Sequence, residues 1–153
     1  MQSKNWILGI LFIGCSMTTL GVLLPTGNVA FALTIYCNFG DCAGTNGADA
    51  MGGTQERNFI TGCGGNDVIS GSGGNDALIG DEDGVCPPNM IRGADRISGG
   101  PGDDSLWHST DEDALPSDGH KDFLDCGPGN DRATINVSVD HDVAVNCETV
   151  LVG

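Results

Sequence analysis

Aspartates recur every nine residues through most of this 153-residue chain. Blocks of nine can be counted from Gly44 and, after a ten-residue interruption at 80–89, again from Met90. The sixth position of these blocks is occupied by Asp49, Asn58, Asp67, Asp76, Asp95, Asp104, Asp113, Asp122, Asp131 and Asp140. Carboxylates are hard oxygen ligands of the kind that bind calcium. The spacing therefore predicts repeated cation-binding positions.

The other positions of the block indicate how these carboxylates are held. Glycines occur at the first, second and fourth positions, where they permit positive φ angles and close backbone approach, so the first six residues can form a tight turn. The last three residues are expected to form a short strand, with the eighth side chain facing inward. The apolar residues at the eighth position are Met51, Ile60, Ile69, Leu78, Ile97, Leu106, Leu115, Leu124 and Ala133. Because so short a strand buries little alone, the turns must stack and share a core.

The blocks resemble the RTX, or haemolysin-type, calcium-binding nonapeptide G-G-x-G-x-D-x-U-x. Residues 99–106 match this pattern fully, and the blocks 62–70 and 71–79 lack only the second glycine. The resemblance covers about residues 44–134. It implies an all-β fold, a right-handed parallel β-roll in which two nonapeptides make one coil. It also implies that Ca²⁺ lies between stacked turns, held by aspartate carboxylates and backbone carbonyls.

Carried over by position, the resemblance implies a set of calcium ligands. These are Asp49, Asp67, Asp76, Asp95, Asp104, Asp113, Asp122 and Asp131, with the fourth-position glycines Gly65, Gly74, Gly102 and Gly129. Neighbours across the stack are expected one full coil apart. The expected pairs are Asp49 with Asp67, Asn58 with Asp76, Asp95 with Asp113, Asp104 with Asp122, and Asp113 with Asp131.

Some blocks depart from the pattern. Met90 and Ile91 replace glycines before Asp95, and Asp111 and His120 replace the fourth glycine of their blocks. The interruption at 80–89 contains Cys86-Pro87-Pro88, and prolines of this kind cannot continue a regular strand. We expect the interruption either to form a loop pinned by a disulfide or to split the array into two short rolls.

The two ends of the chain differ from the repeats. Residues 1–32 have the features of a secretory signal: Lys4, an apolar run over 6–24, and the small residues of Ala30-Phe31-Ala32 before cleavage. An uncleaved anchor is the alternative, since the run is long enough to span a bilayer, and lipid attachment at Cys15 is a third. We interpret 33–43 as an N-terminal cap, 44–134 as the repeat domain, and 135–153 as a C-terminal cap formed by a hairpin of two strands.

Six of the seven cysteines follow the predicted signal, and an even number in a short exported chain indicates disulfides. Six cysteines allow 15 connectivities. Proximity in sequence favours Cys37–Cys42 and Cys126–Cys147. A zinc site of the cysteine type is not indicated, because there is no Cys-x-x-Cys pair and the histidines are scattered.

The formal charge of −15 argues against nucleic acid and anionic membranes as partners. His108, His120 and His141 are expected to be exposed on an acidic surface, and no nucleophile elbow, phosphate loop or His-Glu-x-x-His motif is present. We therefore expect a secreted, monomeric, non-enzymatic protein that folds around calcium. The alternatives are a cell-surface adhesion or assembly module, and a minimal secreted hydrolase that uses His120 or His141.

Overall fold

The computed structural model describes residues 16–18, 33–37, 40–82, 84–88, 90–109 and 118–153, and all regular structure in them is β-strand. Two sheets are present. The first sheet contains, in spatial order, β1 (Ser16–Thr18), β2 (Leu33–Tyr36), β4 (Asp49–Gly52), β6 (Val68–Ser70), β8 (Arg96–Ser98), β10 (Phe123–Asp125) and β12 (Val143–Val145). The second contains β3 (Asp41–Ala43), β5 (Phe59–Cys63), β7 (Ala77–Asp81), β9 (Ser105–Ser109), β11 (Arg132–Ile135) and β13 (Thr149–Val152).

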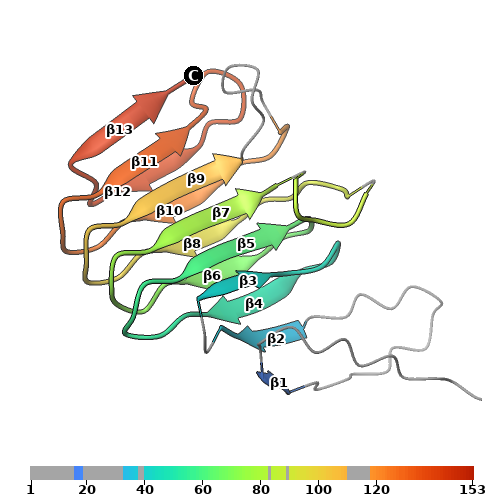
Figure 1. Ribbon diagram of the computed structural model, residues 1–153. Helices are drawn as coiled ribbons and strands as arrows, with labels where there is room; N and C mark the ends of the chain where they lie inside the picture. Colours follow the sequence, from blue (N-terminus) through green and yellow to red (C-terminus); the bar gives the residue numbers. More distant parts are fainter. Residues whose placement is uncertain (1–15, 19–32, 38–39, 83, 89, 110–117) are drawn as a thin grey trace, which may run out of the picture.

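From β2 onward the chain alternates between the two sheets, and each strand pairs in parallel with the next strand of its own sheet. Figure 1 shows the resulting stack of coils, which runs from β2 at one end to β13 at the other. The predicted all-β parallel roll is thus confirmed. The exception is β1, which pairs antiparallel with β2.

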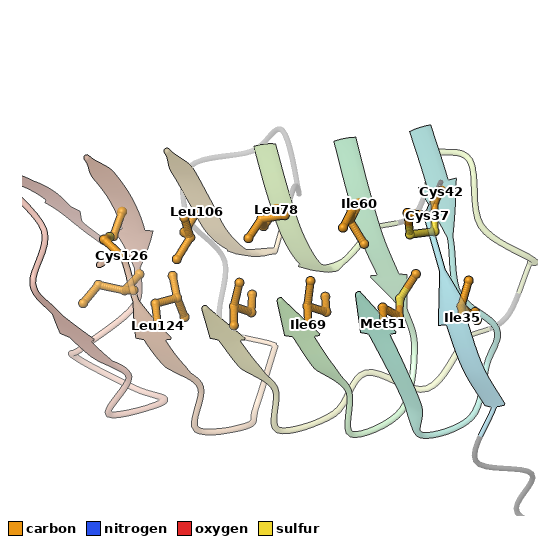
Figure 2. Close-up of a cluster of buried hydrophobic side chains, with 13 residues drawn as sticks. Ile35, Cys37, Cys42, Met51, Ile60, Ile69, Leu78, Leu106, Leu124 and Cys126 are labelled. Atoms are coloured by element: carbon orange, nitrogen blue, oxygen red, sulfur yellow. A yellow bond between two sulfur atoms is a disulfide. The ribbon is translucent and has the colours of Figure 1, made fainter. Parts of the chain in front are cut away.

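The core is a double row of side chains between the sheets. Residues at the eighth position of the blocks are in register along each sheet, as in the pairs Met51↔Ile69 and Ile60↔Leu78. Figure 2 shows these side chains pointing toward one another from the facing strands. The buried members of the two rows are Ile35, Met51, Ile69, Ile97 and Leu124, and Cys42, Ile60, Leu78, Leu106 and Ala133. Each contributes roughly 1–3 kcal/mol through burial.

The interruption at 80–89 does not split the roll. Strand β8 pairs with β6 directly across it, and Ile69 lies beside Ile97. The disulfide Cys63–Cys86 ties the loop to the end of β5. Of the two interpretations the pinned loop is therefore confirmed and the split array is wrong.

The block at 108–116 does not form half a coil, contrary to the prediction. β10 pairs with β8, so Leu124 lies beside Ile97 and the intervening block adds no strand between them. His108 and Ser109 instead extend β9, and residues 110–117 lie outside the described residues. The block contains no glycine, whereas each of the eight blocks from 44–52 to 126–134 that do form half a coil contains at least one.

The C-terminal strands are present, but they do not form a hairpin. β12 extends the first sheet and β13 the second, so they add one more coil. The apolar residues at 135, 137 and 139 alternate with polar ones, as in the first strand of the predicted hairpin, but β11 ends at Ile135, and Val137 and Val139 are exposed. The side chain of Asn136 accepts hydrogen bonds from the backbone N–H groups of Ser138 and Val139, which stabilises a turn instead of a strand.

At the N-terminus, β2 and β3 form the first coil, and Cys37–Cys42 connects them. Cys126–Cys147 connects the last two coils, so both disulfides favoured by proximity are present. Apart from β1, the predicted signal lies outside the described residues, and its cleavage stays a prediction. None of the described residues forms a helix long and apolar enough to cross a membrane.

Candidate metal centre

Each side of the roll carries a line of acidic side chains at the turns. The first column contains Asp49, Asp67, Asp95, Asp122 and Asp142. The second column contains Asn58, Asp76, Asp104, Asp131 and Glu148. All of these except Glu148 are buried. The sixth-position residues are thus brought together along the stack, although they are far apart in the sequence.

A ladder of hydrogen bonds holds the columns in place. In the first column, one carboxylate oxygen of each residue accepts a hydrogen bond from the backbone N–H of the preceding member, as Asp67 Oδ1 does from Asp49 at 2.8 Å. The second column repeats this arrangement, for example between Asp104 Oδ1 and the N–H of Asp76 at 2.8 Å. One oxygen of every carboxylate is therefore fixed by the backbone.

The second oxygen is the chemically informative one. Among the described residues, the Oδ2 atoms of Asp67, Asp76, Asp95, Asp104, Asp122 and Asp131 are buried and have no hydrogen-bond partner. A buried carboxylate oxygen without a partner costs several kcal/mol unless it is protonated or meets a cation. The roll presents such an oxygen in successive coils.

First-position glycines form the space for these oxygens. A Cβ atom placed on Gly62 would collide with Asp67 Oδ2 and lie 2.7 Å from the carbonyl oxygen of Gly80. Gly71 stands in the same relation to Asp76 Oδ2 and to the carbonyl oxygen of Gly99, also at 2.7 Å. A carboxylate and a backbone carbonyl therefore converge where a side chain would otherwise be.

The fourth-position glycines stack in the same manner. The carbonyl oxygens of Gly74 and Gly102 lie where the side chains of Gly102 and Gly129, respectively, would begin. On the other side of the roll, the carbonyl of Gly65 faces Gly93. Gly65, Gly74 and Gly102 also have positive φ angles of 103°, 100° and 145°. The predicted glycines therefore line the turns, and Gly93, which the sequence analysis omitted, belongs with them.

The electrostatics of the columns favour a bound cation. Burial raises the pKa of Asp95 to about 10 and that of Asp67 to about 8, although in each case the backbone N–H of the preceding coil partly offsets the rise. Burial raises the pKa of Asp104 to about 6, and it also raises the pKa of Asp76 and Asp131. Neighbouring carboxylates add to the rise at Asp67, Asp95 and Asp104. The columns therefore resist holding negative charge without a counterion.

These donors fit calcium. They are carboxylate and carbonyl oxygens in a flexible turn, and calcium takes 6–8 such ligands, whereas magnesium demands near-octahedral geometry and keeps its waters. The family model of the RTX calcium-binding nonapeptide repeat matches the chain in four copies, over residues 52–84 and 92–115. The chain carries RTX calcium-binding repeats. No curated protein and no solved structure matches it.

The RTX repeats are paired differently from the prediction after the interruption. The structure brings Asp49 beside Asp67 and Asn58 beside Asp76, as expected. It does not pair Asp95 with Asp113 or Asp104 with Asp122. Instead, Asp95 pairs with Asp122 and Asp104 with Asp131, both 27 residues apart, because the block at 108–116 is left out of the coil. Asp113 lies outside the described residues, so neither its pairing with Asp131 nor its role as a ligand is tested.

Two acidic residues of the columns were missed, and Asp140 was wrongly placed in the frame. Asp142, rather than Asp140, continues the first column, because its Oδ1 accepts the N–H of Asp122 at 2.9 Å. Glu148 ends the second column, where its Oε2 accepts the N–H of Asp131 at 2.7 Å. A nine-residue frame cannot find either position, because the last turns differ in length. That the predicted aspartates and glycines bind calcium stays a prediction.

Proposed function

We propose that this chain is an exported protein whose RTX roll folds around calcium and has a structural, non-catalytic role. The observation that carries the proposal is the set of six buried Oδ2 atoms that have no hydrogen-bond partner among the described residues. They lie in two columns, each beside the preceding coil's aspartate or asparagine. Calcium ions between successive coils would satisfy them.

The charge of the chain explains why calcium would be required for folding, and not only bound by the folded protein. The chain carries 21 acidic and six basic residues, and stacking places aspartates of successive coils in direct contact. The free energy from hydrophobic burial is largely offset by ordering the backbone, which costs roughly 1–2 kcal/mol per residue. Little then remains to compensate several unpaired buried carboxylates, each of which costs several kcal/mol. A cation bound only by the stacked state therefore shifts the equilibrium toward the roll.

The proposed location is outside the cytoplasm. Three disulfides connect the described cysteines, and such bonds persist in oxidising compartments. Extracellular calcium modules typically bind at roughly 10⁻⁴–10⁻³ M, which suits the millimolar ion outside cells. Together with the apolar N-terminal run, this supports export, with residues 1–32 as the signal.

Calorimetric titration with calcium, followed by circular dichroism, tests the calcium-dependent fold. We expect binding of several calcium ions per chain and a gain of β-signal at a calcium concentration of roughly 10⁻⁴–10⁻³ M. Magnesium at the same concentration is the control and should produce little change. Absence of heat, together with an unchanged spectrum on calcium addition, would refute the proposal.

Export is tested separately. Protein recovered from the culture medium of an expressing host should begin at Leu33 when its N-terminus is sequenced. Retention of the intact chain inside the cell would contradict the location while leaving calcium-dependent folding untouched. The adhesion and hydrolase alternatives stay hypotheses. His141 is exposed, and the His120 ring contacts the backbone of Asp118, so neither stands out as a catalytic base.

A further inference from the structure

One histidine is buried inside the acidic array. His108 on β9 is 0 % exposed, which contradicts its predicted place on the surface. Its Nδ1 atom lies 3.7 Å from Asp118 Oδ2, 3.9 Å from Asp122 Oδ2 and 3.7 Å from Asp142 Oδ2. These three carboxylates come from the segment before β10, from the first column, and from the turn before β12. The fold therefore gathers one imidazole and three carboxylates that the sequence separates widely.

His108 occupies a position that is glycine in the preceding coils. The backbone carbonyls of Gly62, Gly80 and His108 lie in turn against Gly44, Gly62 and Gly80. In the coils of Gly62 and Gly80, an aspartate Oδ2 fills the space where a Cβ would be. In the next coil a histidine stands at this position, and its Nδ1 lies 3.9 Å from Asp122 Oδ2. A nitrogen ligand thus stands at one point in a series of oxygen sites.

Neither ring nitrogen of His108 has a hydrogen-bond partner among the residues that the structure describes. The Oδ2 atoms of Asp118 and Asp122 are likewise buried without a partner there. The distances of 3.7–3.9 Å are too long for hydrogen bonds between the ring and the carboxylates. A buried imidazole at such distances from three carboxylates needs a bound group between its ring nitrogen and the carboxylate oxygens.

The carboxylates are held in position by the backbone. Asp122 Oδ1 accepts the N–H of Asp95 at 2.7 Å, and Asp142 Oδ1 accepts that of Asp122 at 2.9 Å. Asp140 accepts the N–H groups of Asp118 and Gly119 at 3.1 and 3.2 Å, so it fixes the segment that bears Asp118. These contacts are the outer-shell support that orients the ligands of a metal site.

From this geometry we propose that the roll contains a transition-metal site of the zinc type, which replaces calcium where the first column reaches Asp122. Its ligands are His108 Nδ1 and one oxygen each from Asp118, Asp122 and Asp142. Imidazole suits zinc and its neighbours in the periodic table, whereas calcium takes oxygen ligands. Four protein ligands fill a tetrahedral shell, and such closed sites are structural. The site would fasten the last two coils to β9.

The dimensions agree with this assignment. Ligand atoms at about 2.0–2.2 Å from zinc in a tetrahedron are about 3.4 Å from one another. The observed distances from Nδ1 exceed this by only a few tenths of an ångström. The ligand atoms of His108, Asp118 and Asp122 all lie within 4.8 Å of one another, and His108, Asp140 and Asp142 form a second such set. His108 is common to both sets, so Asp118, Asp122 and Asp142 must close around its Nδ1 to form one shell.

Titration of the purified, calcium-saturated protein with Co²⁺, a spectroscopic substitute for zinc, tests the site. We expect one equivalent to bind with the visible absorption of tetrahedral cobalt, and Zn²⁺ to abolish that absorption by displacement. His108→Gly restores the glycine of the other coils, so the roll should still fold. This variant should bind Co²⁺ at least 30-fold more weakly. His141→Gly is the control, since His141 is exposed and has a φ of 63°, which suits glycine, and it should bind as the parent does.

The calcium titration of each variant separates the outcomes. Loss of cobalt binding with unchanged calcium heat supports the proposal. Equal cobalt binding by the parent and His108→Gly, or no stoichiometric binding by the parent, overturns it. If His108→Gly does not fold, Asp118→Asn replaces it, with the same expected loss of cobalt binding. Cobalt binding without any calcium heat would refute the proposed function alone.

Discussion

The metal-free roll should be more stable in acid than at neutral pH, which is the reverse of ordinary acid denaturation. Burial raises the pKa of Asp95 to about 10 from an ordinary value of 3.8, and that of Asp67 to about 8. Burial likewise raises the pKa of Asp122. Below about pH 4 these groups are protonated in both the folded and unfolded chains. As the pH rises from there toward 8–10, only the folded chain keeps the protons, so its stability falls.

The magnitude follows from the number of protons retained. Each proton held only by the folded chain changes the unfolding free energy by about 1.4 kcal/mol per pH unit. We count Asp95 as one proton. Asp67 and Asp122 together are counted as one further proton. Asp67 is flanked by the exposed Asn66 and Val68 and is therefore subject to solvent screening, and the charge of Asp118 contributes to the raised pKa of Asp122. Between about pH 5 and pH 7 the loss is then about 5 kcal/mol, comparable with the roughly 5–15 kcal/mol of a typical domain.

Urea unfolding followed by circular dichroism in a chelator, at several pH values, measures this slope. We expect a folded protein near pH 5 that is largely unfolded by pH 7–8 with its disulfides intact. With calcium present the slope should reverse, because protons then compete with the ion for the same oxygens. A metal-free protein that is equally stable at pH 5 and pH 7.5 would refute the reasoning. That result would mean that the columns hold their charges without a cation.

Two substitutions extend the test. Asp104→Asn should remove one calcium site. The stabilisation that saturating calcium provides should then fall by about 1.4–2.7 kcal/mol, which corresponds to roughly 4–10 °C in melting temperature. Asp103→Asn, at the exposed neighbouring position, is the control and should change the melting temperature by less than about 1 °C. Gly71→Ala should weaken calcium binding at least tenfold by calorimetry, because its Cβ would occupy the place of Asp76 Oδ2. Gly84→Ala is the control, since the nearest atom to its Cβ is a Glu82 carboxylate oxygen at 3.4 Å. Equal losses in a variant and its control would contradict the assigned sites.

The repeat was predictable from the sequence because its local and its global requirements coincide. The first-position glycine, the sixth-position aspartate and the eighth-position apolar residue recur in one frame, and the coil places each of them in a row. Ile60 and Leu78 are fully buried, as the spacing indicated, and Asp49 lies beside Asp67, as the resemblance to RTX repeats implied. A pattern that repeats reveals the stacking direction without any knowledge of long-range contacts.

The predictions that were wrong concern features that depend on contacts between residues of different nine-residue blocks. The block at 108–116 keeps the sixth and eighth positions, yet β10 pairs directly with β8 and the block adds no strand between them. The Val137–Val139 alternation resembles a strand, yet the Asn136 side chain diverts the backbone. The burial of His108 depends on three carboxylates contributed by two later segments. No window of nine residues contains that information, although a histidine at a glycine position was a visible signal.

Between β4 and β11 the departures from the frame lie on one side of the roll. The turns that carry the second column, from 53–58 to 126–131, each have six residues between successive strands. On the side of the first column, the loop after β7 and the segment after β9 are both longer, and the Cys63–Cys86 disulfide and His108 also lie there. The longer segments on the first-column side contribute what a six-residue turn does not: Cys86 of the Cys63–Cys86 disulfide, and Asp118 beside His108. The other two disulfides, Cys37–Cys42 and Cys126–Cys147, lie on the second-column side, toward the two ends of the stack. Covalent bonds therefore support both sides of the roll, whereas among the described residues the histidine-centred cluster occurs beside the first column.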